Sequence, residues 1–274
     1  MYFDREKYKQ FARQQIAGRR KTATLAVLIV VVISLLFSIP ESRLNYSWDE
    51  LKMAASTSFS DLLNYINNSG KSNPLTFVFS LIQTIISFIT GIAIASFFLT
   101  YSRSPEPVSL KVFFEGFNKW GRGILAGLWQ TLWFVIWMLA VLAAGLLLMI
   151  PLLFIIPGAD STVNLLSSIL VIACFVVIII KAIEYSHHIY LVAEFPELGI
   201  IKALKISIRI TKGHRAEIFA VHLTFIGYYV LSFLTLGLAQ IWFKPYTEMT
   251  FINIYHALLK DALENGKINP EDLN

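Results

Sequence analysis

The sequence predicts an all-α fold: a polytopic membrane helix bundle of six transmembrane helices, with interfacial amphipathic helices beside it. Residues 124–156 form a run of 33 without one charged side chain, whereas about 20 apolar residues suffice for a helix to cross the hydrocarbon core. Hydrophobic residues make up 56% of the 274 and charged residues 15%, against about 25% charged in ordinary soluble domains. Only one long polar gap separates the apolar segments, so a single membrane domain over 1–274 is expected.

Six apolar segments are predicted to cross the membrane. They are 23–39, 75–101, 124–156, 163–183, 217–236 and 239–259. The last is the weakest, because it contains Lys244, Pro245 and Glu248, and charged residues are costly within a span. The short turn at Thr235-Leu236-Gly237 leaves room only for a tight hairpin between the fifth and sixth segments.

Lysine and arginine residues mark the predicted cytoplasmic side. They number seven in 1–21, four in 102–123 and six in 181–216, but three in 40–74 and none in 158–162. The positive-inside rule therefore predicts that the N-terminus is cytoplasmic and that 40–74 is an external loop. With six spans, the tail 260–274 returns to the cytoplasm, so both termini lie inside.

Three segments outside the spans have the spacing of amphipathic helices. They are a cytoplasmic helix in 1–21, a basic helix in 199–214, and a helix in the external loop from Trp48 to Ile66. The candidate contacts to anionic lipid headgroups are Lys202, Lys205, Arg209, Lys212 and Arg215. Each basic residue near an anionic leaflet gains about 1 kcal/mol. The formal charge of +5 is thus assigned to the membrane surface, and no nucleic acid partner is expected.

Polar residues in the last two predicted spans form a candidate intramembrane site. They are His222, Lys244, Glu248 and Asn253. Lys244 and Glu248 stand four residues apart, a spacing at which side chains on a helix meet, and His222 and Asn253 are expected at similar depth. A charge within a span marks a substrate or proton site by default. The alternative is a structural ion pair beside Pro245.

A second polar cluster, Glu184, His187 and His188, lies at the end of the fourth predicted span. Glutamate and histidine at this spacing can bind zinc or a di-metal centre, but a complete site needs further ligands. Interfacial packing is therefore the favoured alternative, and no metal or cofactor is expected.

Motifs of catalysis are missing from the sequence. It contains no histidine pair four residues apart with a glutamate beside the first, no phosphate-cradling loop and no nucleophile elbow. These absences predict a protein that is not an enzyme.

Several short sequences resemble those of a known family. They are Phe114-Glu115-Gly116-Phe117, Tyr185-Ser186, Ala203-Leu204-Lys205-Ile206-Ser207, Lys212-Gly213-His214-Arg215, Leu223-Thr224-Phe225-Ile226-Gly227, Thr235-Leu236-Gly237 and Pro245-Tyr246. The pattern resembles the DUF975 family of bacterial integral membrane proteins, which is of unknown function. The resemblance implies a multipass protein of the bacterial cytoplasmic membrane, distantly similar to the membrane domains of some glycerophosphodiester phosphodiesterases. It carries no catalytic residues onto this chain.

Three functional hypotheses follow from these observations. The first is a non-enzymatic accessory or transport-related component of the envelope, whose partners are the lipid bilayer, anionic headgroups and a further membrane protein. The second is a transporter or channel that uses the intramembrane polar residues, for which an interior cavity reaching them is the discriminating observation. The third and least supported is a lipid-modifying membrane enzyme built on Glu184, His187 and His188.

Overall fold

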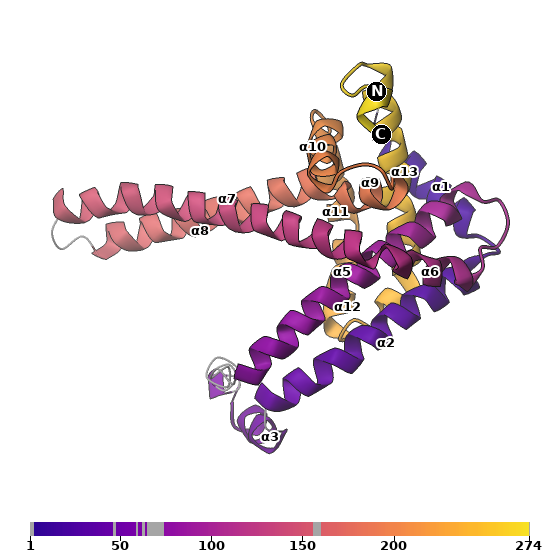
Figure 1. Ribbon diagram of the computed structural model, residues 1–274. Helices are drawn as coiled ribbons and strands as arrows, with labels where there is room; N and C mark the ends of the chain where they lie inside the picture. Colours follow the sequence, from indigo (N-terminus) through magenta and orange to yellow (C-terminus); the bar gives the residue numbers. More distant parts are fainter. Residues whose placement is uncertain are drawn as a thin grey trace.

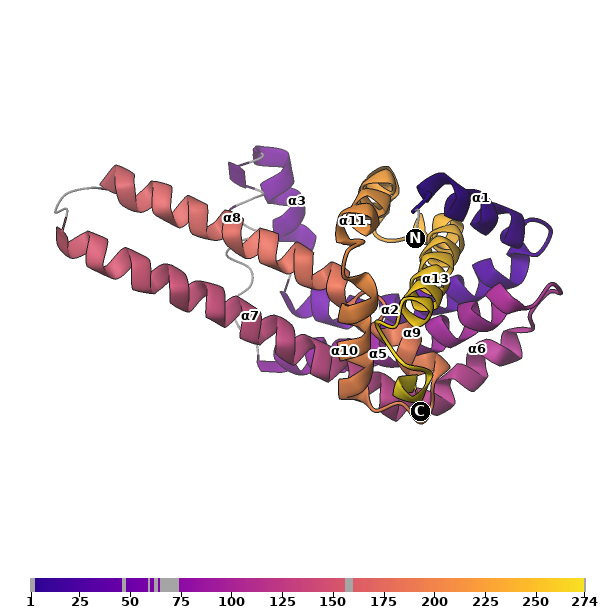
Figure 2. The same cartoon turned by 90° about the horizontal axis from the view of Figure 1, so that it is seen from above.

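The computed structural model describes residues 3–45, 48–58, 60–61, 64, 74–155 and 160–273. These residues form an all-α fold with two long helical hairpins, or arms, that leave a common head (Figure 1). One arm is α2 (Arg20–Asn45) with α5 (Pro74–Arg103), and the other is α7 (Trp120–Ile155) with α8 (Asp160–Tyr185). Helix α3 (Trp48–Thr57) follows α2 at the far end of the first arm. Figure 2 shows the second arm reaching well beyond the head.

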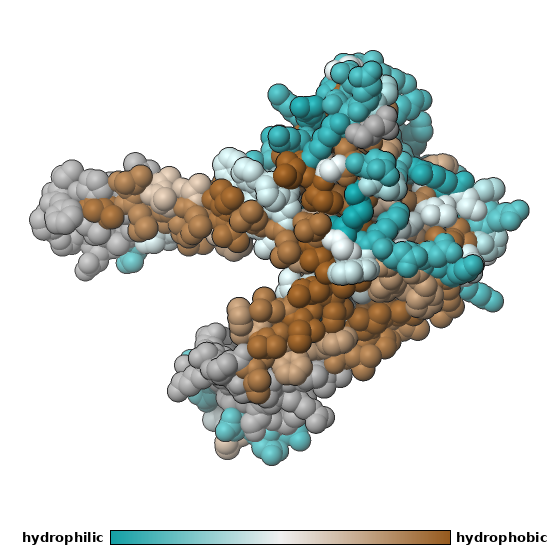
Figure 3. Space-filling view, in the orientation of Figure 1, coloured by the Kyte–Doolittle hydropathy of each residue, from teal (hydrophilic) through white to brown (hydrophobic). Residues whose placement is uncertain are grey.

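The head contains α13 (Gln240–Glu264) and the shorter elements. These are α1 (Arg5–Ile16), α6 (Leu110–Gly116), η1 (Phe117–Lys119), α9 (His188–Glu194), α10 (Ile200–Thr211), α11 (Arg215–Thr224), α12 (Ile226–Leu234) and η2 (Pro270–Leu273). Hydrophilic residues concentrate on the head and hydrophobic residues cover the two arms (Figure 3). The polarity of the molecule is therefore divided between its two parts.

Four helical stretches among the described residues are long and apolar enough to cross a membrane. They are Arg20–Ser38, Leu75–Arg103, Leu110–Leu147 and Asn164–Glu194. Their side chains remain open to the surroundings, as Leu147 at 73% exposure illustrates, and such a large apolar surface is stable only in a nonpolar solvent. Each of the first four predicted spans falls on one of these helices, which confirms that part of the sequence prediction.

The fifth and sixth predicted spans differ from the expectation. Segment 217–236 is not one helix: α11 and α12 are bent by 47° at Phe225, and they reach the criteria for a span only if the bent pair counts as one. Helix α13 covers segment 239–259, yet it is not among the helices apolar enough to cross. The structure thus supports four or five candidate spans by length and composition.

The amphipathic segments predicted from the sequence are helical where the structure describes them. Segment 1–21 contains α1 and 199–214 contains α10. In the segment predicted as helical from Trp48 to Ile66, α3 forms the first ten residues, while residues 59, 62–63 and 65–66 lie outside the described part of the chain. The apolar face of α1 does not lie free for lipid, because Ala12 and Ile16 are buried in the core of the head.

Helix α1 packs along α13 and covers much of it with a polar helix. The side-chain amide of Gln15 accepts a hydrogen bond from Asn253 at 2.8 Å, and the guanidinium of Arg13 lies 5.3 Å from the ring centre of Tyr246. At the far end of α13, Asp261 accepts a hydrogen bond from Lys267 at 2.9 Å, which lowers the pKa of its carboxyl below the usual value. The contacts of Gln15 and Arg13 hold α13 beside α1, and that of Lys267 ties the end of α13 to the residues that follow it.

Glycine residues of α6 and α7 allow both helices to approach α5 closely. A Cβ on Gly127 would lie 2.3 Å from the ring of Phe88, and one on Gly116 would lie 2.8 Å from the backbone of Ala93 in α5. A ring can rotate away, but a helix backbone cannot. Gly116 is therefore the position where the approach of α6 to α5 leaves no room for a side chain.

We predict that Gly116→Ala destabilises the protein by about 1–3 kcal/mol, because the added methyl group overpacks a rigid contact. Gly121→Ala is the matched control, since a Cβ there meets nothing within 4 Å. It should be neutral or stabilising by up to about 1 kcal/mol through helix propensity. Unfolding in detergent, followed by circular dichroism, measures both. Equal stability of the two variants would contradict the packing assigned to Gly116.

Candidate functional site

A polar cavity of about 370 Å³ lies between the end of α8, the bent pair α11–α12 and α13. Its lining consists mostly of side chains that can donate or accept hydrogen bonds. The lining residues are Ser186, His187, Tyr190, His222, Tyr229, Ser232, Gln240, Phe243, Lys244, Thr247, Glu248 and Phe251. We call this space the polar cavity.

The charged part of the polar cavity comes from one turn of α13. Lys244 Nζ lies 2.8 Å from Glu248 Oε1, so the spacing of four residues brings the two side chains together as predicted. The Tyr190 hydroxyl, from α9, donates to the other carboxylate oxygen of Glu248 at 2.8 Å. Both oxygens of this glutamate are thus satisfied, and opposite charges face the same small space.

The bend between α11 and α12 contributes the opposite wall. His222 stacks on Phe251 of α13 with ring centres 4.3 Å apart. Tyr229, seven residues later and past the bend, places its hydroxyl 3.4 Å from His222 Nδ1. At the closed end of the hairpin, Gln240 donates to the Ser232 hydroxyl at 2.9 Å. The break in the helix therefore lines the cavity with side chains from both of its halves.

His187 is the residue of the cavity whose bonding potential is least used. Its side chain is fully buried, and neither ring nitrogen has a hydrogen-bond partner among the described residues. A buried polar group without a partner costs about 1–3 kcal/mol. The ring lines the polar cavity, but both nitrogens are covered, so a polar molecule inside the cavity reaches them only when the neighbouring side chains shift.

Three of the four residues of the predicted intramembrane site meet at the polar cavity, namely His222, Lys244 and Glu248. The fourth, Asn253, is not among the residues that line the cavity, and its side chain donates a hydrogen bond to Gln15 of α1. Tyr190 and Tyr229 also line this site, but no spacing in the sequence links them to α13. The sequence indicates His187 only as a weak candidate metal ligand.

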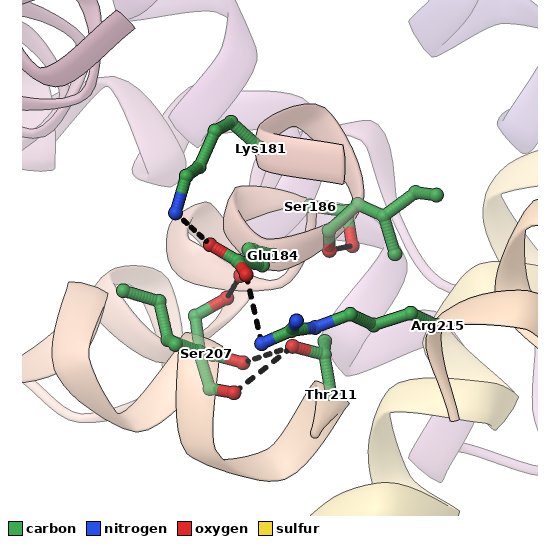
Figure 4. A network of polar contacts seen from close by, with 8 residues as sticks. Lys181, Glu184, Ser186, Ser207, Thr211 and Arg215 are labelled. Atoms are coloured by element: carbon green, nitrogen blue, oxygen red, sulfur yellow. Dashed lines mark hydrogen bonds and ion pairs between the residues drawn. The ribbon is translucent and has the colours of Figure 1, made fainter. Parts of the chain in front are cut away.

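The residues of the weak metal candidate point to different partners. Glu184 accepts from Lys181 at 2.8 Å and pairs with Arg215 at 2.7 Å (Figure 4), whereas His187 lines the polar cavity. His188 lies 3.3 Å from Gln130 and 3.1 Å from the carbonyl of Ile200. In the part of the chain that the structure describes, no three His, Cys, Asp or Glu side chains are grouped to hold a metal ion.

Glu184 instead joins three helices. Its carboxylate, on a side chain that is 4% exposed, binds Lys181 of α8 and Arg215 of α11. Its carbonyl accepts from Ser207 of α10 at 2.7 Å, and Thr211 in turn donates to the carbonyl of Ser207 (Figure 4). This network fixes the end of α8, and with it the position of the residues that follow in the polar cavity.

The predicted lipid contacts are divided by their partners. Arg215 is engaged with Glu184, and Lys202 and Arg209 lie 4.0 and 3.8 Å from the carboxylate of Asp272 in η2. Lys205 and Lys212 are exposed on the outer face of α10. Some of these basic residues therefore form ion pairs within the protein, and the others are exposed on its surface.

The fold and the site define a class: an all-α protein with several apolar helices suited to a multipass membrane protein, and a polar cavity beside a broken helix. A family model matches residues 1–262, and the chain belongs to DUF975, a family of proteins of unknown function. The resemblance seen in the sequence is thereby confirmed. Comparisons with curated proteins and with solved structures found no match.

We predict that Glu184→Gln destabilises the protein by about 2–3 kcal/mol, because it leaves two cations without their buried anion. Glu264→Gln is the control: its pair with Lys260, 3.7 Å apart, is exposed on both sides, and such pairs contribute about 0–1 kcal/mol. Thermal unfolding in detergent compares the two. A Glu184→Gln variant as stable as the control would remove the structural role assigned to this carboxylate.

Proposed function

We propose that this protein is a non-enzymatic, transport-related component of the bacterial cytoplasmic membrane that binds a small polar solute in the polar cavity. The Lys244–Glu248 pair and His187, whose ring nitrogens have no partner among the described residues, line the same cavity. This observation carries the proposal. Partly exposed and buried ion pairs both contribute little net stability, so a pair placed beside a cavity, with Lys244 38% and Glu248 13% exposed, is better explained by binding than by folding. This observation favours the transporter hypothesis over a purely accessory role.

The broken helix supports the same proposal. Membrane transporters place binding sites where a helix is interrupted, because the polar backbone groups freed there must line a cavity rather than face lipid. Here the break at Phe225 lies between His222 and Tyr229, which both line the polar cavity. The serines lining the cavity have other roles: Ser186 donates to the carbonyl of Ile183, and Ser232 accepts from Gln240. Neither is arranged as a nucleophile.

Both termini are proposed to be cytoplasmic, which requires an even number of membrane crossings. The sequence predicts six crossings. In the alternative there are four crossings, and the α12–α13 hairpin enters and leaves the membrane by its cytoplasmic face. The packing of polar α1 along α13 supports the alternative, because α13 then lies beside a cytoplasmic helix. The exposed apolar tip of the hairpin, with Phe233 and Leu236 each 84% exposed, suits immersion in lipid rather than an external loop.

The bilayer is the proposed partner of the arms, and anionic headgroups that of the basic face of α10. Lys205 and Lys212 are exposed beside the apolar Ile201, which suits a helix lying along the inner leaflet. The space between the diverging arms (Figures 1 and 3) is bordered by apolar helices. We propose that a further membrane protein, as well as lipid, packs against the faces of the arms that border this space.

We predict that purified protein in liposomes accelerates entry of a small polar solute, and that Lys244→Met with Glu248→Met abolishes the effect. The double change removes both charges together, so that neither is left buried without its partner. Lys260→Met with Glu264→Met is the matched control, because this pair has the same spacing on an exposed turn of the same helix. Mass spectrometry of solutes trapped from a defined mixture of amino acids, betaine and polyamines gives the readout.

The cavity variant should lower the trapped amount at least about tenfold, as expected for losing charge-assisted contacts, while the exposed-pair variant keeps wild-type uptake. Two results would overturn the proposal. One is wild-type entry no faster than into protein-free liposomes for every solute of the mixture. The other is equal uptake by the cavity and control variants.

We predict that a cysteine at Leu236, in a Cys174→Ser background, is not labelled from outside intact cells by a membrane-impermeant maleimide. The hairpin that returns to the cytoplasmic face never presents its tip outside. Ser56→Cys in α3, exposed in the predicted external loop, is the positive control. Labelling of the Leu236 position at the level of the control would establish the six crossings that the sequence predicts.

A further inference from the structure

A second cavity, of about 580 Å³, lies on the other side of the α12–α13 hairpin. The turn between α1 and α2 forms one wall, and the hairpin forms the other. The lining residues are Arg13, Ile16, Ala17, Gly18, Arg20, Tyr228, Leu231, Ala239, Trp242, Phe243 and Tyr246. We call this space the arginine cavity, because its charges are two arginines and the remaining lining is mainly apolar or aromatic.

Neither arginine of this cavity pairs with an acidic side chain within the described part of the chain. Arg13 lies over the ring of Tyr246, and Arg20 donates to the carbonyl of Trp242. A guanidinium has five donors in a planar fork that matches the oxygens of a phosphate. Two such groups on one cavity without a protein anion make the site complementary to a bound anion.

The opposite wall is complementary to a hydrocarbon chain. Leu231 is 47% exposed and Trp242 60% exposed along the hairpin, and Phe233 and Leu236 are still more exposed at its tip. Tryptophan and tyrosine side chains favour the level of the headgroups, with their rings against the acyl chains. With the apolar tip in the hydrocarbon, the arginines at the base of the hairpin lie at headgroup depth.

We propose that the arginine cavity binds one anionic phospholipid, with its phosphate on Arg13 and Arg20 and an acyl chain along Leu231 and Trp242. A free phosphate fits the charges but leaves the apolar wall exposed, and a neutral lipid fits the wall but leaves the cations unpaired. The bound lipid bridges the α1–α2 turn and the hairpin. This proposal is independent of solute binding, since Arg13 and Arg20 are not part of the polar cavity.

Native mass spectrometry of the full-length protein tests the proposal. The protein is released from micelles that contain equal amounts of phosphatidylglycerol and phosphatidylcholine, and retained lipids are counted. Wild type should keep one phosphatidylglycerol, and Arg13→Gln with Arg20→Gln should lower that retention at least about tenfold, because both phosphate contacts are lost. Arg5→Gln with Lys21→Gln removes the same charge from exposed positions outside the cavity and should retain the lipid.

A conservative variant separates binding from folding. Arg13→Lys with Arg20→Lys keeps both charges, so it should retain phosphatidylglycerol better than the glutamine variant if the phosphate is the ligand. Thermal unfolding of lipid-free protein shows whether the glutamine variant is folded. If it is unfolded, the lysine variant is compared with wild type instead. Weaker phosphatidylglycerol retention by the lysine variant then supports bidentate contacts from arginine, and undiminished retention counts against them.

Four results would overturn the proposal. The first is the same phosphatidylglycerol retention by the cavity variant and the control variant. The second is retention of phosphatidylcholine by wild type equal to its retention of phosphatidylglycerol. The third is an increase in thermal stability with inorganic phosphate as large as that with phosphatidylglycerol. The fourth is a dimer mass that is lost in the Arg13→Gln, Arg20→Gln variant, which would assign the cavity to a second copy of the chain.

Discussion

The burial of the seven-residue helix α9 is the constraint on which the rest of the head depends. A helix this short leaves most of its backbone groups without partners inside it, and α9 packs among α5, α7 and α10. Lys119 donates to the carbonyl of Ala193 at 2.6 Å, and Arg122 donates to the carbonyls of Phe195 and Leu198. Because Arg122 lies in the first turn of α7 and Lys119 lies just before it in η1, these bonds also fix where the second arm leaves the head.

The same helix distributes polar side chains in different directions. Successive residues of a helix point about 100° apart, so His188 faces away from His187, whereas Tyr190, three residues after His187, lines the polar cavity with it. His188 is taken up by Gln130 and the carbonyl of Ile200, and Tyr190 reaches Glu248. Only His187 is left facing the polar cavity without a protein partner among the described residues. The arrangement that keeps Glu184 and His188 away from His187 thus leaves His187 at the polar cavity.

The arms were predictable from the sequence because a long apolar run forms a membrane-spanning helix. The Lys244–Glu248 pair was predictable because side chains four residues apart on a helix are neighbours. What the sequence could not predict involves distant partners. Asn253 meets Gln15, which is 238 residues away, and hydropathy does not record which polar groups meet. The bend at Phe225 has no proline within it, so the segment 217–236 reads as one continuous span.

The hairpin of α12 and α13 links the two cavities mechanically. The Phe243 side chain lines both, so the hairpin is their common wall. One end of the hairpin is a break in the helix, while α13 is held past its first turns by α1 through Arg13 and Asn253. A molecule that fills either cavity therefore contacts the α12–α13 hairpin, which also lines the other cavity.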